Sequence, residues 1–198
     1  PTRTPVFTTR GPGSGEKGGY VTFQGNYRQL TLADTATGRF LSGREPSAVA
    51  LAGLTGDNIA EIGAVDTMDA RVTVMRGAGQ GSFQAPVNFT ADRGPVDITE
   101  ADIDGDAEID AVVANRQSGT VSFLRGNGKS NLRSPINFPA GPNPTELVTG
   151  DFNADRLLDV AALNATAGKI SVLAGHERKI LDSRVAVSIG AGAAGLTA

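Results

Sequence analysis

Two nine-residue stretches carry the densest array of metal-ligating side chains in the chain. Residues 102–110 read DIDGDAEID, with aspartates at positions 1, 3, 5 and 9 and a glycine at position 4. Residues 151–159 read DFNADRLLD, with the same pattern but an asparagine at position 3. Alternate carboxylates in a tight loop can turn toward one centre, and Ca²⁺ takes about six to eight oxygen ligands. The two stretches therefore predict hard-cation binding.

Three other interpretations of these carboxylates compete with that prediction. An EF-hand needs a glutamate at position 12 and flanking helices, but Val113 and Ala162 stand there, within apolar runs. Metal-free turns would suit Asp and Gly, although clustered carboxylates without a cation would repel one another. Glycoside hydrolysis also uses paired carboxylates. Since the loop repeat explains every pair, we expect a protein that is not an enzyme.

Composition excludes several classes of function. The chain has 198 residues and a net charge of -3, so no basic excess indicates nucleic-acid binding. It contains no apolar run long enough for a membrane span. Cysteine is absent, which excludes disulfides, thiolate zinc sites and a cysteine nucleophile without excluding secretion.

The chain is built from an internal repeat of 49 residues. Pro46, Pro95 and Pro144 share this spacing, as do the apolar positions 72, 121 and 170. The repeat predicts one region over residues 1–198, with units at 1–43 (degenerate), 44–92, 93–141 and 142–190. Residues 191–198 form a low-complexity tail.

Each unit contains four apolar or alternating runs, which predict four strands. The second runs are continuously apolar, which indicates burial on both faces, whereas the third runs alternate and indicate half-buried strands. Four strands per repeat of this length are typical of a propeller blade. We therefore expect an all-β fold: a β-propeller of about four four-stranded blades, either closed by itself or part of a larger ring. The expected strands are 47–52, 62–66, 71–76 and 85–90, then 96–101, 111–115, 120–125 and 134–139, then 145–150, 160–164, 169–174 and 184–189.

The first unit departs from this pattern. Residues 4–12 resemble a fourth strand, and residues 20–23 and 29–33 resemble second and third strands. The glycine-rich residues 13–19 replace the carboxylate loop. They lack the strand and helix that flank a phosphate-binding loop, so a turn is expected.

Several motifs together resemble the FG-GAP/VCBS repeat of integrin-α-type β-propellers. The resemblance lies in GSFQAPV at 81–87, Gly94-Pro95, ADIDGD at 101–106 and DAVVAN at 110–115, and it extends over about 44–190 and loosely over 1–43. It implies antiparallel four-stranded blades with calcium bound between the first two strands. It also implies a secreted or cell-surface protein, with the periplasm as an alternative, and a role in adhesion or ligand binding.

Carried over by position, the resemblance implies two calcium sites. The loop at 53–61 keeps only Asp57 and Glu61 as carboxylates and is expected to bind no calcium or to bind it very weakly. The first site would use the side chains of Asp102, Asp104, Asp106 and Asp110 and the carbonyl of Glu108, and the second those of Asp151, Asn153, Asp155 and Asp159 with the carbonyl of Leu157.

The resulting hypothesis is a non-enzymatic, calcium-stabilised extracellular module that binds a protein or carbohydrate. Two alternatives stay open: an accessory domain of a larger secreted enzyme, and a structural subunit of an extracellular assembly. Self-association and a missing remainder of the ring are also open. Recognition is expected in variable turns such as 67–69 and 116–119. His176 and the asparagines at 88, 115 and 164 are expected to be turn residues, and the glycosylation sequon at Asn164 to be a chance match.

Overall fold

The described part of the chain consists of β-strands. The computed structural model describes residues 7–8, 24–25, 46–52, 54, 59–79, 82–129, 131–176, 180–190 and 195–196. A single 3₁₀ turn at Ala165–Ala167 (η1) is the one helical element of these residues, and none of them forms a helix suited to crossing a bilayer. The prediction of an all-β fold is therefore confirmed.

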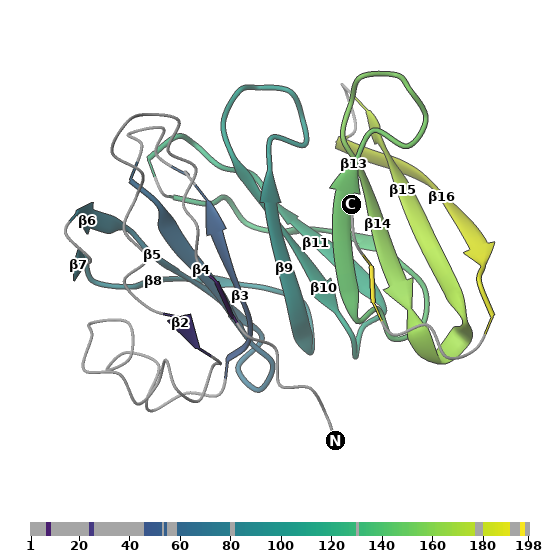
Figure 1. Cartoon of the computed structure of the whole chain (residues 1–198), viewed down its shortest axis with the longest axis horizontal. Helices are drawn as coiled ribbons and strands as arrows, with labels where there is room; N and C mark the ends of the chain where they lie inside the picture. The colour runs from purple at the N-terminus through teal and green to yellow at the C-terminus, as the bar shows by residue number, and fades with distance from the viewer. Residues whose placement is uncertain are drawn as a thin grey trace.

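Three four-stranded antiparallel sheets follow one another along the chain (Figure 1). In each, the strands lie side by side in chain order, so every connection within a sheet is local. The first sheet contains β3 (Pro46–Ala52), β4 (Glu61–Asp66), β5 (Arg71–Met75) and β8 (Val87–Thr90); the middle sheet β9 (Pro95–Ala101), β10 (Asp110–Asn115), β11 (Thr120–Leu124) and β12 (Ile136–Pro139); the last sheet β13 (Glu146–Gly150), β14 (Asp159–Asn164), β15 (Lys169–His176) and β16 (Ile180–Ser188).

Two short pairs complete the described strands. The glycine-rich connection between β5 and β8 forms a hairpin of β6 (Gly77–Gly79) and β7 (Ser82–Phe83), which the sequence did not predict. Near the N-terminus, β1 (Phe7–Thr8) pairs with β2 (Gln24–Gly25). The strands expected at 20–23 and 29–33, and the glycine-rich residues 13–19, lie outside the described residues.

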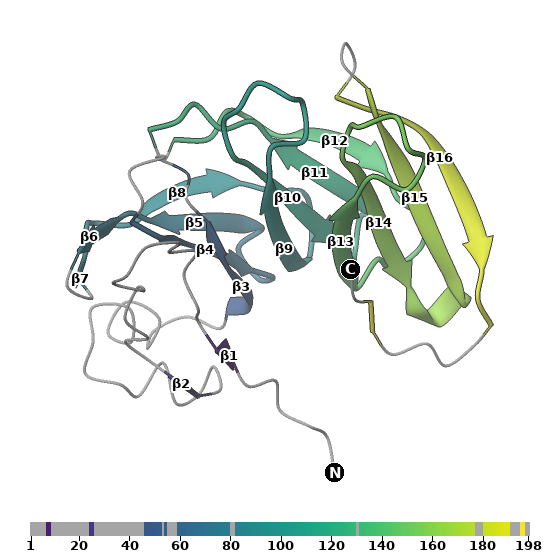
Figure 2. The same cartoon turned by 45° about the horizontal axis from the view of Figure 1, so that its top comes forward.

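The three sheets are joined through their first strands. Strand β9 packs between β3 and β13, as both views show (Figures 1 and 2). The Pro95 carbonyl oxygen accepts hydrogen bonds from Ser47 Oγ at 2.9 Å and Thr67 Oγ1 at 2.6 Å. On the other side, the Leu147 N–H donates to Asp97 Oδ2 at 2.7 Å. These bonds fix how each sheet sits against the next.

Apolar side chains fill the two spaces between neighbouring sheets. One cluster joins the first and middle sheets around residues such as Val65, Val72 and Val113, and the other joins the middle and last sheets around Val112 and Phe123. Every residue of β4, β10 and β14 is buried, which confirms the prediction that the second strands are covered on both faces.

The third strands differ from the prediction that they are half-buried. In β5 and β11 every residue after the first is buried, and only β15 alternates. The prediction failed because the polar residues of these strands are satisfied inside the protein. Ser122 Oγ, for example, donates to Asn137 Oδ1 at 2.7 Å, and Thr73 Oγ1 donates to Asn88 Oδ1 at 2.8 Å.

His176 also differs from its expected place in a turn. It is the last residue of β15 and pairs with Ile180 of β16. The last sheet extends past the expected strand ends because a register shift at Leu173/Ala174 lets the two strands continue.

Candidate metal centre

The loop at 102–110 connects β9 to β10 and is folded around its first aspartate. Asp102 Oδ1 accepts hydrogen bonds from the N–H groups of Gly105 at 2.8 Å and Asp106 at 3.1 Å. Asp102 Oδ2 accepts one from Ala107 at 2.9 Å. Gly105 and Ala107 have φ values of 75° and 69°, so the backbone turns sharply at both. These turns direct the remaining side chains of the loop toward one another.

Three carboxylates converge inside this loop. One oxygen each from Asp102, Asp104 and Asp106 lie within 4.8 Å of one another. The Asp104 side chain is 2% exposed, and neither of its oxygens accepts a hydrogen bond from a described residue. The Arg125 guanidinium forms an ion pair with Asp104 Oδ2. The loop thus holds a buried carboxylate that is ion-paired at Oδ2 and has no partner among the described residues at Oδ1.

This oxygen cluster fits Ca²⁺. Calcium–oxygen bonds are about 2.3–2.6 Å long, so ligand oxygens around one ion lie up to roughly 5 Å apart. Buried carboxylates are costly unless charge compensates them, and the single Arg125 guanidinium faces a cluster of three carboxylates, which leaves negative charge that a cation would offset. Asp102, Asp104 and Asp106 could therefore hold the ion from three sides, with Asp104 as the innermost ligand.

Asp110 lies at the base of the loop, outside the three-carboxylate group. Its Oδ2 accepts the N–H of Ile103 at 3.0 Å, and its Oδ1 accepts the N–H of Gly126 at 2.9 Å. Burial raises the pKa of Asp110 to about 6. The two hydrogen bonds lower this pKa, and repulsion from the carboxylates of Asp104 and Asp106 raises it further. We call this arrangement the clasp, because it ties both ends of the loop to Gly126, the second residue after β11. The role of Asp110 as a metal ligand stays a prediction.

The loop at 151–159 repeats the same backbone arrangement between β13 and β14. Asp151 accepts N–H groups from Asp155 at 3.2 Å and Arg156 at 2.9 Å, and the Arg156 bond is the main reason that the pKa of Asp151 is lowered. Asp159 forms the equivalent clasp with the N–H groups of Phe152 at 2.9 Å and Gly175 at 2.8 Å. Both loops project from the same edge of the molecule, after β9 and β13 (Figure 1).

The centre of this second loop differs from that of the first. Asn153 is exposed, and its Nδ2 donates to Asp155 Oδ2 at 3.0 Å. Its Oδ1 accepts the N–H of Asp155 at 2.9 Å. Within the described ranges, the Asp102 group is the one set of three or more acidic, His or Cys side chains that converge. The amide of Asn153 thus takes up an Asp155 oxygen that a cation would otherwise use.

The two residues whose carbonyls are predicted ligands are hydrogen-bonded to these carboxylates through their N–H groups. The Glu108 N–H donates to Asp106 Oδ1 at 2.9 Å, and the Leu157 N–H donates to Asp155 Oδ1 at 2.8 Å. In the third loop Leu54 and Glu61 are buried, while Asp57 lies outside the described residues. The expectation that this loop binds no calcium stays a prediction.

Sequence reasoning missed the glycines that receive each clasp. A Cβ on Gly126 would lie 2.0 Å from the Ile109 carbonyl oxygen, and one on Gly175 would lie 2.5 Å from that of Leu158. Gly77 meets Ala60 in the same way, at 2.5 Å. These glycines share the 49-residue spacing, so the repeat could have revealed them. Arg125 recurs only in part at this spacing, because Arg76 stands 49 residues before it but alanine stands 49 residues after it, at position 174.

Asn115 and Asn164 are buried rather than placed in turns as expected. Asn164 Nδ2 donates to Ser171 Oγ at 3.0 Å and to the Ala140 carbonyl at 3.1 Å, and Asn115 is hydrogen-bonded with Ser122 Oγ at 2.8 Å. The prediction was wrong because each asparagine links the second and third strands of its sheet. Asn164 is 1% exposed, so its side chain cannot be glycosylated in the folded protein, which agrees with a chance match to the sequon.

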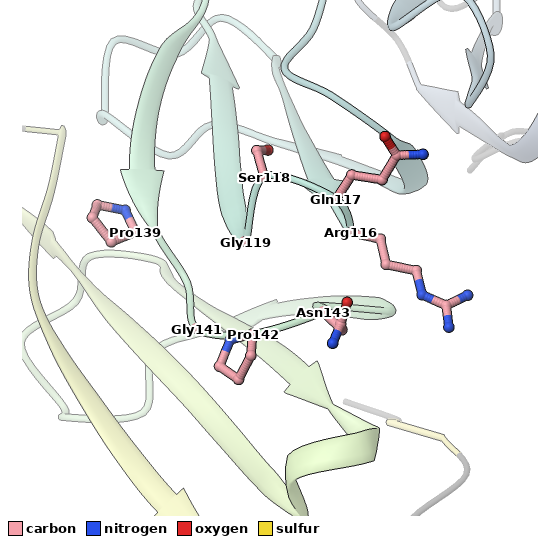
Figure 3. Close-up of a pocket in the computed structure, with 8 residues that line it drawn as sticks. All are labelled: Arg116, Gln117, Ser118, Gly119, Pro139, Gly141, Pro142 and Asn143. Carbon is pink, nitrogen blue, oxygen red and sulfur yellow. The ribbon is translucent and has the colours of Figure 1, made fainter.

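A pocket lies at the opposite end of the middle sheet from the 102–110 loop. Strand β10 begins at Asp110 in the clasp and ends at Asn115, just before the turn that forms one wall. The other wall is the connection that follows β12, and Figure 3 shows Arg116 and Gln117 extending from the turn with Asn143 across from them. The pocket has a volume of about 440 Å³ and is lined by Arg116, Gln117, Ser118, Gly119, Pro139, Gly141, Pro142 and Asn143.

Comparison with known families agrees with this arrangement. Residues 102–162, which run from the first loop through the second and into β14, match the model of the FG-GAP-like repeat. The repeat over this stretch is therefore FG-GAP-like, as the sequence resemblance indicated. No curated protein matches the sequence.

Proposed function

We propose that this protein is a calcium-stabilised, non-enzymatic β-propeller module that acts outside the cell and binds a protein or a glycan. The single observation that carries the calcium proposal is the Asp104 carboxylate. The side chain is buried and ion-paired with Arg125 at Oδ2, its Oδ1 has no partner among the described residues, and one of its oxygens converges with oxygens of Asp102 and Asp106.

The propeller proposal rests on how the sheets are built and stacked. Each sheet has four antiparallel strands in chain order, and the three first strands lie next to one another. Apolar clusters fill the spaces between sheet faces, as they do between blades. Each sheet is then one blade, with residues 1–43 as a degenerate fourth, and the FG-GAP-like match supports an extracellular type of repeat module.

Calcium has a structural role in this proposal. The loop joins the first two strands of a blade, so an ion held there fixes one strand against the other. Binding to the folded state alone stabilises it by RT ln(1 + [L]/Kd), about 2.7 kcal/mol at a hundredfold excess. Extracellular calcium modules have Kd values of roughly 10⁻⁴–10⁻³ M, so such sites fill outside the cell and stay empty in the cytosol. This supports the proposal of a secreted, cell-surface or periplasmic setting.

Ligand recognition is assigned to the pocket at the other end of the middle sheet. Its walls offer the Arg116 guanidinium, the amides of Gln117 and Asn143 and the apolar rings of two prolines. These groups suit the hydroxyls, carboxylates and C–H faces of a glycan or of a polar peptide segment. A glycan array and a panel of extracellular matrix proteins, probed with the chain and with Arg116→Ala and Asn143→Ala, test this location. Binding that both variants retain in full would place recognition elsewhere.

Thermal unfolding tests the calcium proposal. At calcium concentrations about tenfold above Kd, stability should rise by about 1.4 kcal/mol. For a chain of this size that is a rise in Tm of roughly 3–6 °C relative to chelator. Magnesium at the same concentration is the control, since it prefers a smaller octahedral site with retained waters and should raise Tm much less. An identical midpoint in calcium and chelator would contradict a structural calcium.

A further inference from the structure

The pocket at the end of the middle sheet has an uncompensated positive charge. Arg116 is the one charged residue among the eight that line it, and none of the eight is acidic. Its side chain is exposed, and no described carboxylate forms an ion pair with it. Figure 3 shows the guanidinium extending away from the turn, with Asn143 on the facing wall. This guanidinium is therefore available to a ligand.

A second arginine stands beside the same turn. The Arg93 carbonyl oxygen accepts the N–H of Ser118 at 3.2 Å, and the side chain of Arg93 is exposed. The neighbouring carboxylate, Asp92, already accepts the Arg93 N–H at 2.8 Å and the Thr120 hydroxyl at 2.9 Å. Two guanidinium groups thus share this rim with one carboxylate that is hydrogen-bonded to the protein, which leaves the charge of Arg116 without a counter-charge.

The two walls of the pocket are held together by the backbone. The Ala140 N–H donates to the Gly119 carbonyl at 2.9 Å. A Cβ on Gly119 would lie 2.8 Å from the Gly141 carbonyl oxygen, so the close approach of the walls requires a glycine there. The buried Asn164 anchors the second wall, since its Nδ2 donates to the Ala140 carbonyl at 3.1 Å. The pocket is therefore formed before a ligand arrives, which lowers the entropic cost of binding.

The same contacts favour a glycan over a peptide as the ligand. A peptide that binds by adding a strand needs a row of unpaired backbone N–H and C=O groups. At this rim the N–H groups of Arg116, Ser118, Gly119 and Ala140 all donate to carbonyls of the chain itself. The pocket offers instead a guanidinium, amides and a hydroxyl in a volume of about 440 Å³. Such groups suit the ring substituents of a short oligosaccharide.

The charge at this turn is not repeated in the other two sheets. The residues 49 positions before and after Arg116 are Thr67 and Ala165. In the first sheet the turn has Asp69 instead, which forms an ion pair with Arg71 at 3.2 Å. The middle sheet therefore has a single cationic site, and Thr67 shows a residue that the same turn accepts without the charge.

We propose that this pocket binds an acidic glycan, whose carboxylate or sulfate group pairs with the Arg116 guanidinium. This rests on the proposed location of ligand recognition and adds the chemical class of the ligand. A guanidinium binds anionic oxygens through two parallel N–H bonds, which fixes the orientation of the sugar that bears them. The amides of Gln117 and Asn143 then hydrogen-bond the neighbouring hydroxyls. A neutral glycan would leave the charge of Arg116 unused.

A glycan array of matched pairs tests the role of this charge. Each uronic-acid glycan stands beside its carboxyl-reduced form, and each sulfated glycan beside its desulfated form. We expect the chain to bind acidic members, and its affinity to fall at least about tenfold for the neutral partner, as for loss of one hydrogen bond to a charged group. The uronate and sulfate pairs distinguish which of the two anions is recognised.

Variants at Arg116 test the location. Arg116→Thr introduces the residue of the first sheet and should lower affinity for the acidic members at least about tenfold. Arg116→Lys should keep part of that affinity, because lysine retains the charge but not the paired N–H groups. Arg133→Ala is the matched control: Arg133 is also exposed, but its N–H donates to Arg125, which follows β11 at the other end of the sheet. This control should bind as the natural chain does.

Three results would overturn the proposal. Equal affinity for acidic and neutral partners would leave the pocket as a site for neutral glycans, and the proposed recognition function would stand. An equal loss in Arg116→Thr and Arg133→Ala would reduce the effect to the net charge of the chain. Binding to an extracellular matrix protein but to no glycan would make the ligand a protein. Binding to neither would contradict the proposed recognition function as well.

Discussion

The loops at 102–110 and 151–159 have the same backbone and different centres. Both wrap their first aspartate in backbone N–H groups, and both end in a buried aspartate that accepts one N–H from the loop and one from a glycine, which follows β11 in one sheet and lies near the end of β15 in the other. At position 3, however, the first loop has the buried and ion-paired Asp104, whereas the second has the exposed Asn153. The fold of the loop is therefore separable from the chemistry at its centre.

This difference indicates which residues hold structure and which would hold an ion. The clasp aspartates use both oxygens on the protein itself, so they act whether or not a cation is present. Asp104 has no such partner among the described residues except the Arg125 guanidinium. We expect substitutions in the clasp to lower stability in both loops alike. Substitutions at position 3 should change calcium binding alone.

The largest effect is expected from loss of the clasp. Asp110→Ala and Asp159→Ala each leave two backbone N–H groups without an acceptor, at roughly 1–3 kcal/mol per buried group. Each should lower the free energy of unfolding by about 2–4 kcal/mol, measured by urea unfolding in chelator. A loss seen only in the presence of calcium would show that these aspartates act through the metal instead.

Substitution of the two glycines that donate to the clasp aspartates, Gly126 and Gly175, should lower stability to different extents. A Cβ at position 126 approaches the Ile109 carbonyl to 2.0 Å, and one at 175 approaches that of Leu158 to 2.5 Å. Both need the backbone to shift, so Gly126→Ala should cost about 2–3 kcal/mol and Gly175→Ala somewhat less. Thermal unfolding of the two variants side by side checks the order, and the reverse order would contradict the account of the clasp.

An exchange at position 3 should move calcium binding from one loop to the other. Asp104→Asn gives the first loop the centre of the second and removes one charged ligand, so the calcium-dependent gain of about 1.4 kcal/mol at tenfold excess over Kd should largely vanish. Asn153→Asp should add a comparable gain. Differential scanning calorimetry with and without calcium measures both, and a wild-type calcium response in Asp104→Asn would contradict the assignment of the first loop.

The smallest effect on calcium binding is expected from Arg125, whose guanidinium is ion-paired with Asp104. Arg125→Ala removes a positive charge that opposes an incoming ion, and should tighten calcium binding several-fold, as expected for one nearby charge in a partly buried site. Ala174→Arg should weaken binding at the second loop by a similar factor. Calorimetric titration of both variants tests this, and weaker binding in Arg125→Ala would mean that the guanidinium organises the site.

The repeat explains why so much of the fold could be predicted. Proline spacing and apolar runs placed the first three strands of each sheet within a few residues, and all second strands are buried as expected. The third strands were misjudged because alternation alone cannot show that Ser122 and Thr73 find partners inside the protein. Burial of a polar residue depends on a partner that lies on another strand.

The residue types of the candidate site could be predicted from the sequence. Which aspartates hold the backbone and which converge around a candidate ion site could not. The aspartate pattern identified both loops, yet Asp110 and Asp102 look alike in sequence. Only the fold shows that Asp110 is tied to Gly126 while Asp102, Asp104 and Asp106 converge. The ion pair of Asp104 with Arg125 is not repeated, because the positions equivalent to Asp104 are Thr55 and Asn153, although Arg76 is equivalent to Arg125.

The central claim is that calcium binds among Asp102, Asp104 and Asp106. The most direct measurement is a calcium titration followed by amide chemical shifts of the isotopically labelled chain. We predict that the Gly105, Ala107 and Glu108 amides shift together, with a Kd of roughly 10⁻⁴–10⁻³ M, and that they stay unchanged in Asp104→Asn. Unchanged shifts of these three amides in the wild-type chain up to about 10 mM calcium, well above that range, would contradict the claim.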